Sequence, residues 1–446
     1  MTSEVQIRAG GRARLAAWAA LACALALVPL GLAPPAADAA GVSSARVDAG
    51  DGGFWTPARM RAAVPLDAPA TASVIDGAAT LPDSIAAAEG EPLSVPPAGA
   101  SAAMLTPRGG VTAARPQFGT VGDPSRSAVR MHGRVFFKIR GGGLATCSGT
   151  AIRSNRRNLV LTAGHCVNGG GHSGDWYRKW VFVPGYQNGR SPFGVWRAHR
   201  LYATPIWVEF RDPSGDVGLA TVGRRKGRSL QSTVGARGIR FGGDANRKML
   251  ALGYPANRND GFNGESERYC FARFDGRDRH LRGRLGPRPI SMPCNMTEGA
   301  SGGGWIDRKG FAVSVSSYFY PRLEDTLFGP YFGSLAHELY DATQIRCNNR
   351  VATIVGTPKG ERIRGTSHRD VVSAGAGNDR VVGLGKRDVL CGGPGKDRLG
   401  GGKGGDSIYG GAGNDRLNGG GGHDFCSGGG GRNRGRSCER SRGLEN

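Results

Sequence analysis

The stretch N-L-V-L-T-A-G-H-C at residues 158–166 joins a short apolar run to a histidine, and two blocks of related character follow it. Residues 215–220 read G-D-V-G-L-A, and residues 298–305 read E-G-A-S-G-G-G-W. Each block presents a residue suited to catalysis beside glycines or a strand-like apolar run. In chain order these residues are His165, Asp216 and Ser301.

Short β-type runs separated by Gly, Pro and Asn extend on both sides of these blocks, over residues 118–345. Clear examples are residues 135–139 (V-F-F-K-I), 180–183 (W-V-F-V), 248–252 (K-M-L-A-L) and 311–315 (F-A-V-S-V). Many short strands with turn residues between them are typical of an all-β barrel or sandwich. Near the end of the region, the helical spacing of Leu335, Leu339 and Ala342 predicts one helix at about residues 334–343.

The residue types in the three blocks suit nucleophilic catalysis. A serine hydroxyl such as that of Ser301 is a weak nucleophile until a base removes its proton during attack. His165 would be that base and would return the proton to the leaving group. A carboxylate would hold the imidazole in the required tautomer and stabilise its charged form. Asp212 competes with Asp216 for this role, and Asp216 is preferred because a strand-like run follows it directly.

In sequence and in order, the T-A-G-H-C, D-V-G-L-A and G-A-S-G-G segments resemble the active-site blocks of trypsin-like serine peptidases, closest to the bacterial branch that includes glutamyl endopeptidases. The resemblance covers residues 118–345 and implies a chymotrypsin-like double β-barrel, two six-stranded antiparallel barrels with the site between them. It implies cleavage of protein or peptide substrates through an acyl-enzyme, without a cofactor for catalysis. His165, Asp216 and Ser301 would be the triad, and the N–H groups of Gly299 and Ser301 would form the oxyanion hole.

Two features depart from the family pattern. Ala300 stands where zymogen-type trypsins have the aspartate that pairs with a freed N-terminus, so that activation switch is not expected. The expected substrate-pocket residues are Asn295, Thr297 and Ser317. They include neither the acidic residue of Lys/Arg-specific trypsins nor the histidine of glutamyl endopeptidases, so the sequence supports neither of those preferences.

Nine cysteines occur in the chain, and eight of them follow the N-terminal apolar segment. An even number in an exported chain indicates disulfides, and none of the eight forms the C-x-x-C pair typical of zinc sites. The first expected pair follows from the family resemblance, the second flanks the approach to Ser301, and the last two bracket the early and the final repeats described below. The four pairs are Cys147–Cys166, Cys270–Cys294, Cys347–Cys391 and Cys426–Cys438.

From residue 355 onward a nine-residue pattern repeats, in the form G-G-x-G-x-D-x-U-x with U a large apolar residue. Fixed-period self-similarity predicts a solenoid. The pattern resembles the calcium-binding parallel β-roll of repeat-in-toxin proteins, in which Gly-rich turns and aspartates bind Ca²⁺ and two nonapeptides make one coil. Aspartates eighteen residues apart would then face each other across a Ca²⁺. The expected ligands are Asp379, Asp388, Asp397, Asp406, Asp415 and Asp424.

Two other interpretations of the repeat stay open. A Gly-rich segment can be a flexible linker, although the strict register argues against this. A β-roll that binds Ca²⁺ only weakly is also compatible with the sequence. Arginines such as Arg380 and Arg398 directly follow the aspartates, and a nearby positive charge opposes cation binding.

The N-terminal residues carry a targeting signal. Arginines precede an almost wholly apolar run at residues 15–32, and A-D-A at residues 37–39 fits a small-residue cleavage site. Retention as a signal anchor is the alternative, and the prolines and small residues favour cleavage, after which no membrane span is expected. Residues 40–117 are rich in Ala, Pro, Gly and Ser and indicate a pro-segment or a tether rather than a packed domain.

The sequence therefore divides into five parts. They are a signal peptide (1–39), a low-complexity pro-segment or linker (40–117), a trypsin-like peptidase domain (118–345), a calcium-binding β-roll (346–438) and a tail (439–446).

The chain carries a formal net charge of +23. A solvated basic surface explains such a charge, and affinity for anionic substrates or an anionic cell envelope is the functional alternative. No aromatic-interleaved basic stripe occurs, so nucleic acid is not an expected partner. The leading hypothesis is a secreted, extracellular serine endopeptidase. The alternative is a calcium-dependent extracellular binding or adhesion protein whose peptidase-like domain is inactive.

Overall fold

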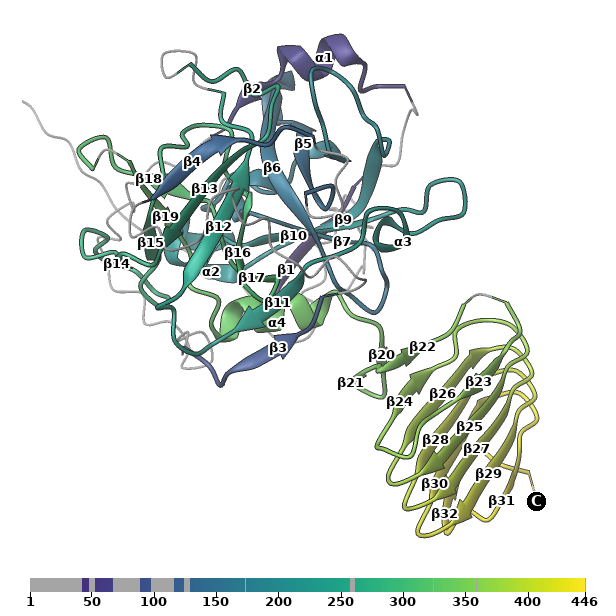
Figure 1. The fold of residues 1–446 in the computed structure, drawn as a ribbon. Coiled ribbons are helices and arrows are strands. Elements are labelled where there is room, and N and C mark those ends of the chain that lie inside the picture. Colours follow the sequence, from purple (N-terminus) through teal and green to yellow (C-terminus); the bar gives the residue numbers. More distant parts are fainter. Residues whose placement is uncertain are drawn as a thin grey trace, which may run out of the picture. The chain divides into compact units, whose positions relative to one another are not determined.

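The computed structural model describes residues 42–47, 53–66, 89–97, 116–123, 129–172, 174–256, 261–323, 325–357 and 359–445. This part of the chain is built mainly of β-strands, first in a region of two halves and then in a region of stacked repeats (Figure 1). The signal peptide predicted at residues 1–39 lies outside the described residues. Within them, no helix combines the length and the apolar character needed to cross a membrane.

The first half of this region is a closed barrel of six strands. Each strand pairs antiparallel with the next, and the last returns to the first. In barrel order the strands are β5 (His132–Lys138), β6 (Leu144–Ile152), β7 (Leu159–Thr162), β10 (Gly218–Val222), β9 (Trp196–Ala203) and β8 (Arg178–Pro184). The core contains Val135, Leu161 and Trp180, which come from the apolar runs noted above. The all-β fold predicted from these runs is confirmed.

The second half divides its strands between two sheets. One contains β11 (Gly238–Phe241), β17 (Phe311–Val315), β16 (Gly304–Asp307), β12 (Lys248–Gly253) and β13 (Arg268–Arg273), in that order. The other contains β14 (Gly276–Arg277), β15 (Ile290–Pro293), β19 (Thr326–Gly329) and β18 (Tyr318–Phe319). The disulfide between Cys270 in β13 and Cys294, which follows β15, joins the two sheets covalently.

Short pieces of the segment before residue 118 are part of this fold. Four of them add strands to the two halves: β1 (Ser43–Arg46) on β9, β2 (Val64–Pro65) on β6, β3 (Leu93–Val95) on β11 and β4 (Gln117–Thr120) on β13. A short helix, α1 (Pro57–Ala62), buries Met60 against Phe136 and Tyr186. The expectation that residues 40–117 lack packed structure is therefore wrong for these pieces. Strands of two to four residues are too short to show a periodic pattern in the sequence. They become strands because they pair with an exposed edge of a sheet, which the segment itself does not reveal.

After helix α4 (Ser334–Ala342), which the helical spacing predicts, a small hairpin of β20 (Arg346–Cys347) and β21 (Arg350–Val351) leads into a parallel β-solenoid of two sheets. One sheet contains β22 (Ile354–Val355), β24 (Val371–Ser373), β26 (Val389–Pro394), β28 (Ser407–Ala412), β30 (Phe425–Gly430) and β32 (Arg440–Arg442). The other contains β23 (Arg362–Arg364), β25 (Arg380–Gly385), β27 (Arg398–Lys403), β29 (Arg416–Gly421) and β31 (Arg434–Arg436).

The register of the solenoid is that of an eighteen-residue coil, because Leu399 pairs with Leu417 in the next strand of the same sheet. The apolar residue of each nonapeptide is buried between the sheets, as Leu390, Leu399 and Ile408 illustrate. The predicted boundary at residue 438 is too early. Strand β32 continues the first sheet, and Glu445 forms an isolated bridge with Arg434.

Candidate active site and calcium-binding repeats

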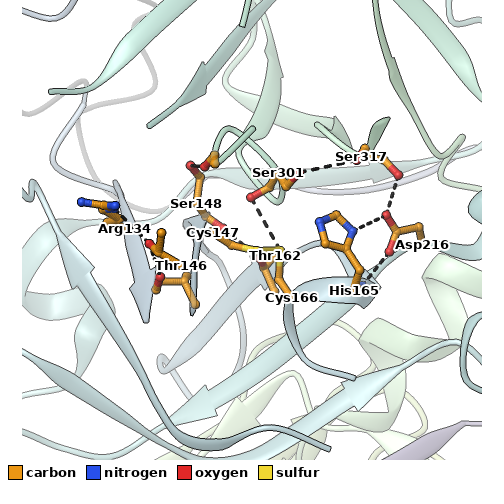
Figure 2. Close-up of a disulfide and its surroundings, with 12 residues drawn as sticks. Arg134, Thr146, Cys147, Ser148, Thr162, His165, Cys166, Asp216, Ser301 and Ser317 are labelled. Atoms are coloured by element: carbon orange, nitrogen blue, oxygen red, sulfur yellow. Dashed lines mark hydrogen bonds and ion pairs between the residues drawn. A yellow bond between two sulfur atoms is a disulfide. The ribbon is translucent and has the colours of Figure 1, made fainter. Parts of the chain in front are cut away.

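Strand pairing in the first barrel brings the histidine and aspartate blocks together. His165 lies in the 3₁₀ turn Gly164–Cys166, directly after β7. Asp216 lies between the 3₁₀ turn Pro213–Gly215 and β10. Because β7 and β10 are antiparallel and Gly218 is opposite Thr162, the end of one strand meets the start of the other. Ser301 precedes β16 of the second half, and Figure 2 shows all three side chains at one place.

His165 and Asp216 form a closely bonded pair. His165 Nδ1 lies 2.8 Å from Asp216 Oδ2, and the His165 backbone N–H donates to Asp216 Oδ1 at 2.7 Å. The aspartate is fully buried. A carboxylate at Nδ1 favours the neutral tautomer that carries its proton there, which leaves Nε2 as an acceptor. Nε2 is buried and has no hydrogen-bond partner among the described residues.

The hydroxyl of Ser301 is turned toward the second half of the molecule. Its Oγ donates to the Ser317 carbonyl oxygen at 3.5 Å rather than to His165 Nε2. A serine hydroxyl changes partner by rotation about one bond, and catalytic hydrogen bonds are often long or misaligned without substrate. The three side chains therefore lie together with the Ser–His hydrogen bond not yet formed.

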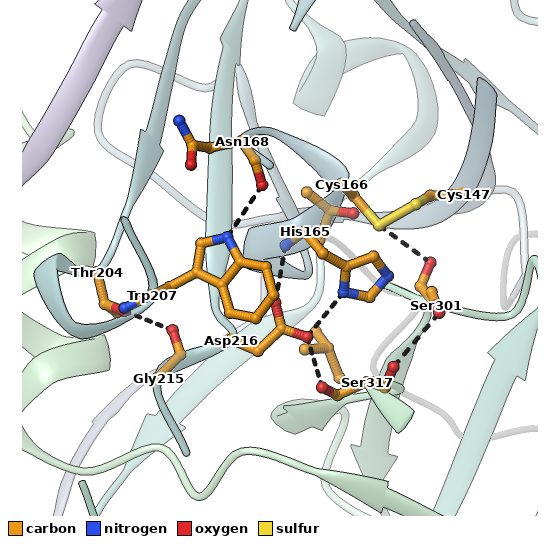
Figure 3. A network of polar contacts seen from close by, with 12 residues as sticks. Cys147, His165, Cys166, Asn168, Thr204, Trp207, Gly215, Asp216, Ser301 and Ser317 are labelled. Atoms are coloured by element: carbon orange, nitrogen blue, oxygen red, sulfur yellow. Dashed lines mark hydrogen bonds and ion pairs between the residues drawn. A yellow bond between two sulfur atoms is a disulfide. The ribbon is translucent and has the colours of Figure 1, made fainter. Parts of the chain in front are cut away.

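Ser317 contacts Asp216 instead of lining a pocket. Its hydroxyl donates to Asp216 Oδ2 at 2.5 Å (Figure 3). We therefore assign the Ser317 side chain to holding the aspartate, which sequence reasoning missed. The signal available was its place just after the strand that follows the serine block, but the direction of the side chain depends on a register that the sequence does not display.

Asp212, the competing aspartate, does not contact the histidine. Its carboxylate accepts hydrogen bonds from the backbone N–H groups of Ser214 and Leu285, and burial raises its pKa. It thereby braces the turn before Asp216 against the loop that precedes β15. Of the two candidates, Asp216 is the one placed to orient His165.

Trp207 lies against the imidazole. The two ring centroids are 6.0 Å apart, and the indole N–H donates to the Asn168 carbonyl at 3.0 Å (Figure 3). Gly164 is required here, because a Cβ at this position would approach both Trp207 and Asp216 Oδ1 to within 3.0 Å. The glycine of the T-A-G-H-C block thus permits the close packing of the indole and the carboxylate around the histidine turn.

The backbone beside Ser301 presents two free donors. Gly299 has a φ of +91°, a conformation that glycine adopts without strain. Ser148 fixes the loop, since its Oγ donates to the Gly299 carbonyl at 2.8 Å and its N–H donates to the Ser301 carbonyl at 2.7 Å. Among the described residues, the N–H groups of Gly299 and Ser301 have no acceptor. These are the two donors expected to form the oxyanion hole.

The other two predicted pocket residues lie on the loop before the serine. Asn295 and Thr297 are partly exposed, and Thr297 Oγ1 is a buried atom without a partner among the described residues. Tyr318 and Tyr320, in and after β18, donate their hydroxyls to the buried carboxylate of Asp278 at 2.6 and 2.9 Å. Asp278 is therefore satisfied, whereas Oε2 of Glu298, next to Thr297, is buried and has no partner among the described residues.

The eight cysteines are joined in four disulfides within the described residues. The pairs are Cys147–Cys166, Cys270–Cys294, Cys347–Cys391 and Cys426–Cys438. The first links β6 to the histidine turn (Figure 2), and the last lies at the end of the solenoid.

The solenoid aspartates leave one buried oxygen each without a partner. In every case Oδ1 accepts the backbone N–H of the residue eighteen positions earlier, as Asp397 does from Asp379 at 2.8 Å. The second oxygen, Oδ2, is buried and unbonded in Asp379, Asp388, Asp397, Asp406, Asp415 and Asp424. These are the six residues expected to be metal ligands, and buried carboxylate oxygens without partners are costly unless a cation compensates them.

Glycine carbonyls complete these positions. A Cβ on Gly401 would lie within 2.6 Å of both Asp406 Oδ2 and the Gly419 carbonyl oxygen, so only glycine leaves room there. Gly410 has the same relation to Asp415 and to the Gly428 carbonyl. Carboxylate and backbone oxygens around a space that a side chain would fill form the donor set that Ca²⁺ prefers, and the site thus fits the ion.

The ends of the aspartate series are closed by other residues. Asp370 Oδ2 is already occupied by the N–H and the hydroxyl of Thr366. At the other end, Asn433 and Glu439 supply the acceptors for Asp415 N–H and Asp424 N–H, which sequence reasoning missed. The nine-residue spacing alone shows Asn433 in the aspartate column.

Burial raises the pKa of Asp388 and of Asp397 to about 6, and neighbouring carboxylates add to the effect. The pKa values of Asp379, Asp406 and Asp415 are also raised, again mainly by burial. Without a bound cation, these aspartates therefore resist full ionisation.

Two family models match the chain. A trypsin-like peptidase domain covers residues 147–315, and RTX calcium-binding nonapeptide repeats cover residues 364–399 and 400–434. A search of curated proteins found no match.

Solved structures similar to the chain include several proteases. The protease Anisep from Arthrobacter nicotinovorans is 32% identical, with a TM-score of 0.46, over 50% of this chain and 97% of that one. A thermostable serine protease, AL20, from an extremophilic microorganism is 34% identical, with a TM-score of 0.44, over 48% and 97%. A Glu endopeptidase is 18% identical, with a TM-score of 0.42, over 52% and 98%. The chain belongs to the trypsin-like serine peptidase family and carries RTX calcium-binding repeats after its peptidase domain.

Proposed function

We propose that the protein is an exported serine endopeptidase in which Ser301 is the nucleophile, His165 the general base and Asp216 the residue that orients the base. The observation that carries the proposal is the bonded His165–Asp216 pair beside Ser301, with two free backbone N–H groups next to the serine. This arrangement supplies a base, an orienting carboxylate and an anion-stabilising site at one position, which acyl transfer requires.

The reaction begins when a substrate carbonyl enters beside Ser301. The hydroxyl rotates from the Ser317 carbonyl to His165 Nε2, which takes its proton as Oγ attacks. The N–H groups of Gly299 and Ser301 stabilise the oxyanion, and one such donor typically lowers the barrier by about 3 kcal/mol. His165 then protonates the leaving amine. In the second half of the reaction, His165 takes a proton from a water molecule that attacks the acyl group, and it returns this proton to Ser301 Oγ as the acid product leaves.

Asp216 holds the imidazole in place throughout the reaction. Its two oxygens accept three hydrogen bonds, from the His165 backbone N–H, from His165 Nδ1 and from the Ser317 hydroxyl. The negative charge stabilises the imidazolium that forms during attack, and the backbone bond fixes the direction of the carboxylate.

In the repeat region, the six aspartates with a free Oδ2 and the glycine carbonyls beside them would hold Ca²⁺. The bound ion would neutralise the carboxylates and link successive coils. Asp388 and Asp406, eighteen residues apart in successive coils, would supply oxygens to the same ion. Export is proposed because disulfides and structural Ca²⁺ both suit an extracellular setting. The alternative of an inactive peptidase-like domain is not favoured, because no residue of the triad is replaced.

Labelling with a serine-reactive phosphonate tests the proposal. Incubation of the purified protein with a biotinylated diphenyl phosphonate should add one label, which peptide mapping should place on Ser301. His165→Ala should abolish the labelling, whereas His172→Ala, at an exposed histidine of the same barrel, should not. Labelling at another residue, or none in correctly folded protein, would leave the calcium-dependent binding hypothesis as the better one.

A further inference from the structure

Five arginines form a column on one sheet of the solenoid. Each begins a strand, and the strands pair in parallel and in register, so each arginine lies directly beside the next. They are Arg362, Arg380, Arg398, Arg416 and Arg434. Figure 1 shows their strands, β23 to β31, stacked side by side. Neighbouring strands are about 4.8 Å apart, so five cations lie along about 19 Å.

These charges are exposed and uncompensated. All five side chains are exposed, and none forms an ion pair with a described residue. The adjacent aspartates do not neutralise them, because Asp379 and Asp397, for example, are 2% and 1% exposed and turn into the roll. Like charges directly opposite on neighbouring strands destabilise a sheet. The neighbouring arginines therefore repel one another, and a bound anion would reduce this repulsion.

A groove follows the column. It has a volume of about 650 Å³ and is lined by the arginines from Arg380 to Arg434 together with Gly400, Gly402 and Asn418. Gly400 and Gly402 leave space beside the arginines, and the exposed Val382 and Arg436 also line the groove, so an extended chain along the arginines would contact both.

We propose that this arginine column binds an extended, linear polysaccharide that carries one carboxylate on each sugar residue. Guanidinium groups bind carboxylates through two parallel hydrogen bonds, and arginine is the side chain suited to that geometry. The charge repeat of such a chain is comparable with the spacing of the strands. No aromatic side chain lines the groove, whereas proteins that bind single-stranded nucleic acid stack its bases on aromatic rings. The proposal uses residues of the solenoid alone and does not depend on the proposed peptidase function.

The experiment is a binding titration of the full-length protein in saturating Ca²⁺, with linear polyglucuronate as the probe and neutral dextran as the comparison. We expect polyglucuronate alone to bind, with an affinity that falls steeply with added NaCl, since several counterions are displaced at once. The double variant Arg398→Gln/Arg416→Gln removes the middle of the column and should weaken binding at least about tenfold.

The matched control is Arg440→Gln/Arg442→Gln, which removes two exposed strand arginines from β32 of the other sheet. It should bind like the unchanged protein. Equal losses in both variants, or no binding at low salt, would overturn the proposal. Tighter binding of an oligodeoxythymidylate through the same arginines would assign the column to nucleic acid instead. If the variants fail to fold, the unchanged protein still tests the proposal. A polyglucuronate affinity that does not change with added NaCl would reject it.

Discussion

At the scale of single residues, the account depends on how Asp216 is held. The carboxylate is fully buried, and hydrogen bonds from His165 and Ser317 take the place of water around it. A buried charge is tolerated when it is hydrogen-bonded in this way. Asp212 is also buried, but its partners are the backbone N–H groups of Ser214 and Leu285. The two aspartates are thus assigned different roles, and substituting each one in turn tests this assignment.

Asp216→Asn should lower kcat by about 10⁴-fold while the protein stays folded, because the amide favours the wrong histidine tautomer. Asp212→Asn is the matched control and should lower kcat by no more than about tenfold, since it keeps one of the two backbone bonds and Asp212 does not contact His165. Steady-state hydrolysis of an unfolded protein substrate measures both. A larger loss for Asp212→Asn than for Asp216→Asn would reverse the assignment of the orienting residue.

At the scale of structural elements, each solenoid coil buries one apolar residue per nonapeptide and leaves one carboxylate oxygen unbonded. Glycine-rich turns lose much backbone entropy when they become ordered. Packing of single side chains such as Leu399 offsets only part of this cost, so Ca²⁺ should contribute substantially to the stability of the roll.

Asp397→Asn should raise the Ca²⁺ concentration needed to protect residues 380–430 from hydrogen exchange by about tenfold. The asparagine keeps the Oδ1 acceptor for Asp379 N–H and removes only the free oxygen. Asp370→Asn is the control, because Asp370 Oδ2 is already bonded to Thr366. The prediction is contradicted if both variants shift the calcium midpoint equally. It is also contradicted if a chelator leaves the hydrogen-exchange protection of the unchanged protein as it was.

Without Ca²⁺, the stability of the roll should fall as the pH rises from about 4 to about 6. The pKa values of Asp388 and Asp397 are raised to about 6 by burial, whereas an aspartate in the unfolded chain has a pKa of about 3.9. In this window the folded state binds more protons than the unfolded state, so raising the pH favours unfolding. Hydrogen exchange in chelator should show stronger protection at pH 4.5 than at pH 7. Saturating Ca²⁺ should abolish the difference, and protection that increases with pH in chelator would refute the proposed cause.

Some structural elements can be predicted from the sequence and others cannot. The repeat is readable because its period, its apolar residue and its aspartate are all local, and the three blocks are readable because the chemistry fixes their residue types. The role of the Ser317 hydroxyl was missed because it depends on the register of β17 and β18. The strands before residue 118 were missed because Ser43–Arg46 and Val64–Pro65 have no apolar alternation of their own. Long-range pairing specifies these features, and a single segment does not contain it.

At the scale of the whole molecule, the pieces between residues 42 and 120 extend the sheets of both halves of the peptidase region. Trp55 and Met60 also pack against the first barrel, where Trp55 donates to the Lys179 carbonyl. Such contacts indicate that these pieces stabilise the fold.

Met60→Ala should therefore lower the free energy of unfolding of the purified protein by about 2–5 kcal/mol, the range for truncating a buried methionine. Met60 is 2% exposed, and Arg59→Ala, at an exposed position of the same helix, should have little effect. Denaturant unfolding, with the N-terminus of the same sample sequenced, measures this. An unchanged stability for Met60→Ala would show that residues 53–66 do not contribute to the mature fold.

The most direct test of the central claim compares the unchanged protein with Ser301→Ala in the hydrolysis of an unfolded protein substrate. The substitution removes one buried oxygen and should leave the circular dichroism spectrum and the melting temperature nearly unchanged. The account predicts that kcat falls by about 10⁶-fold, as expected when the nucleophile of a triad is lost. A Ser301→Ala protein that cleaves the substrate at the unchanged rate would contradict the assignment of His165, Asp216 and Ser301 as the catalytic triad.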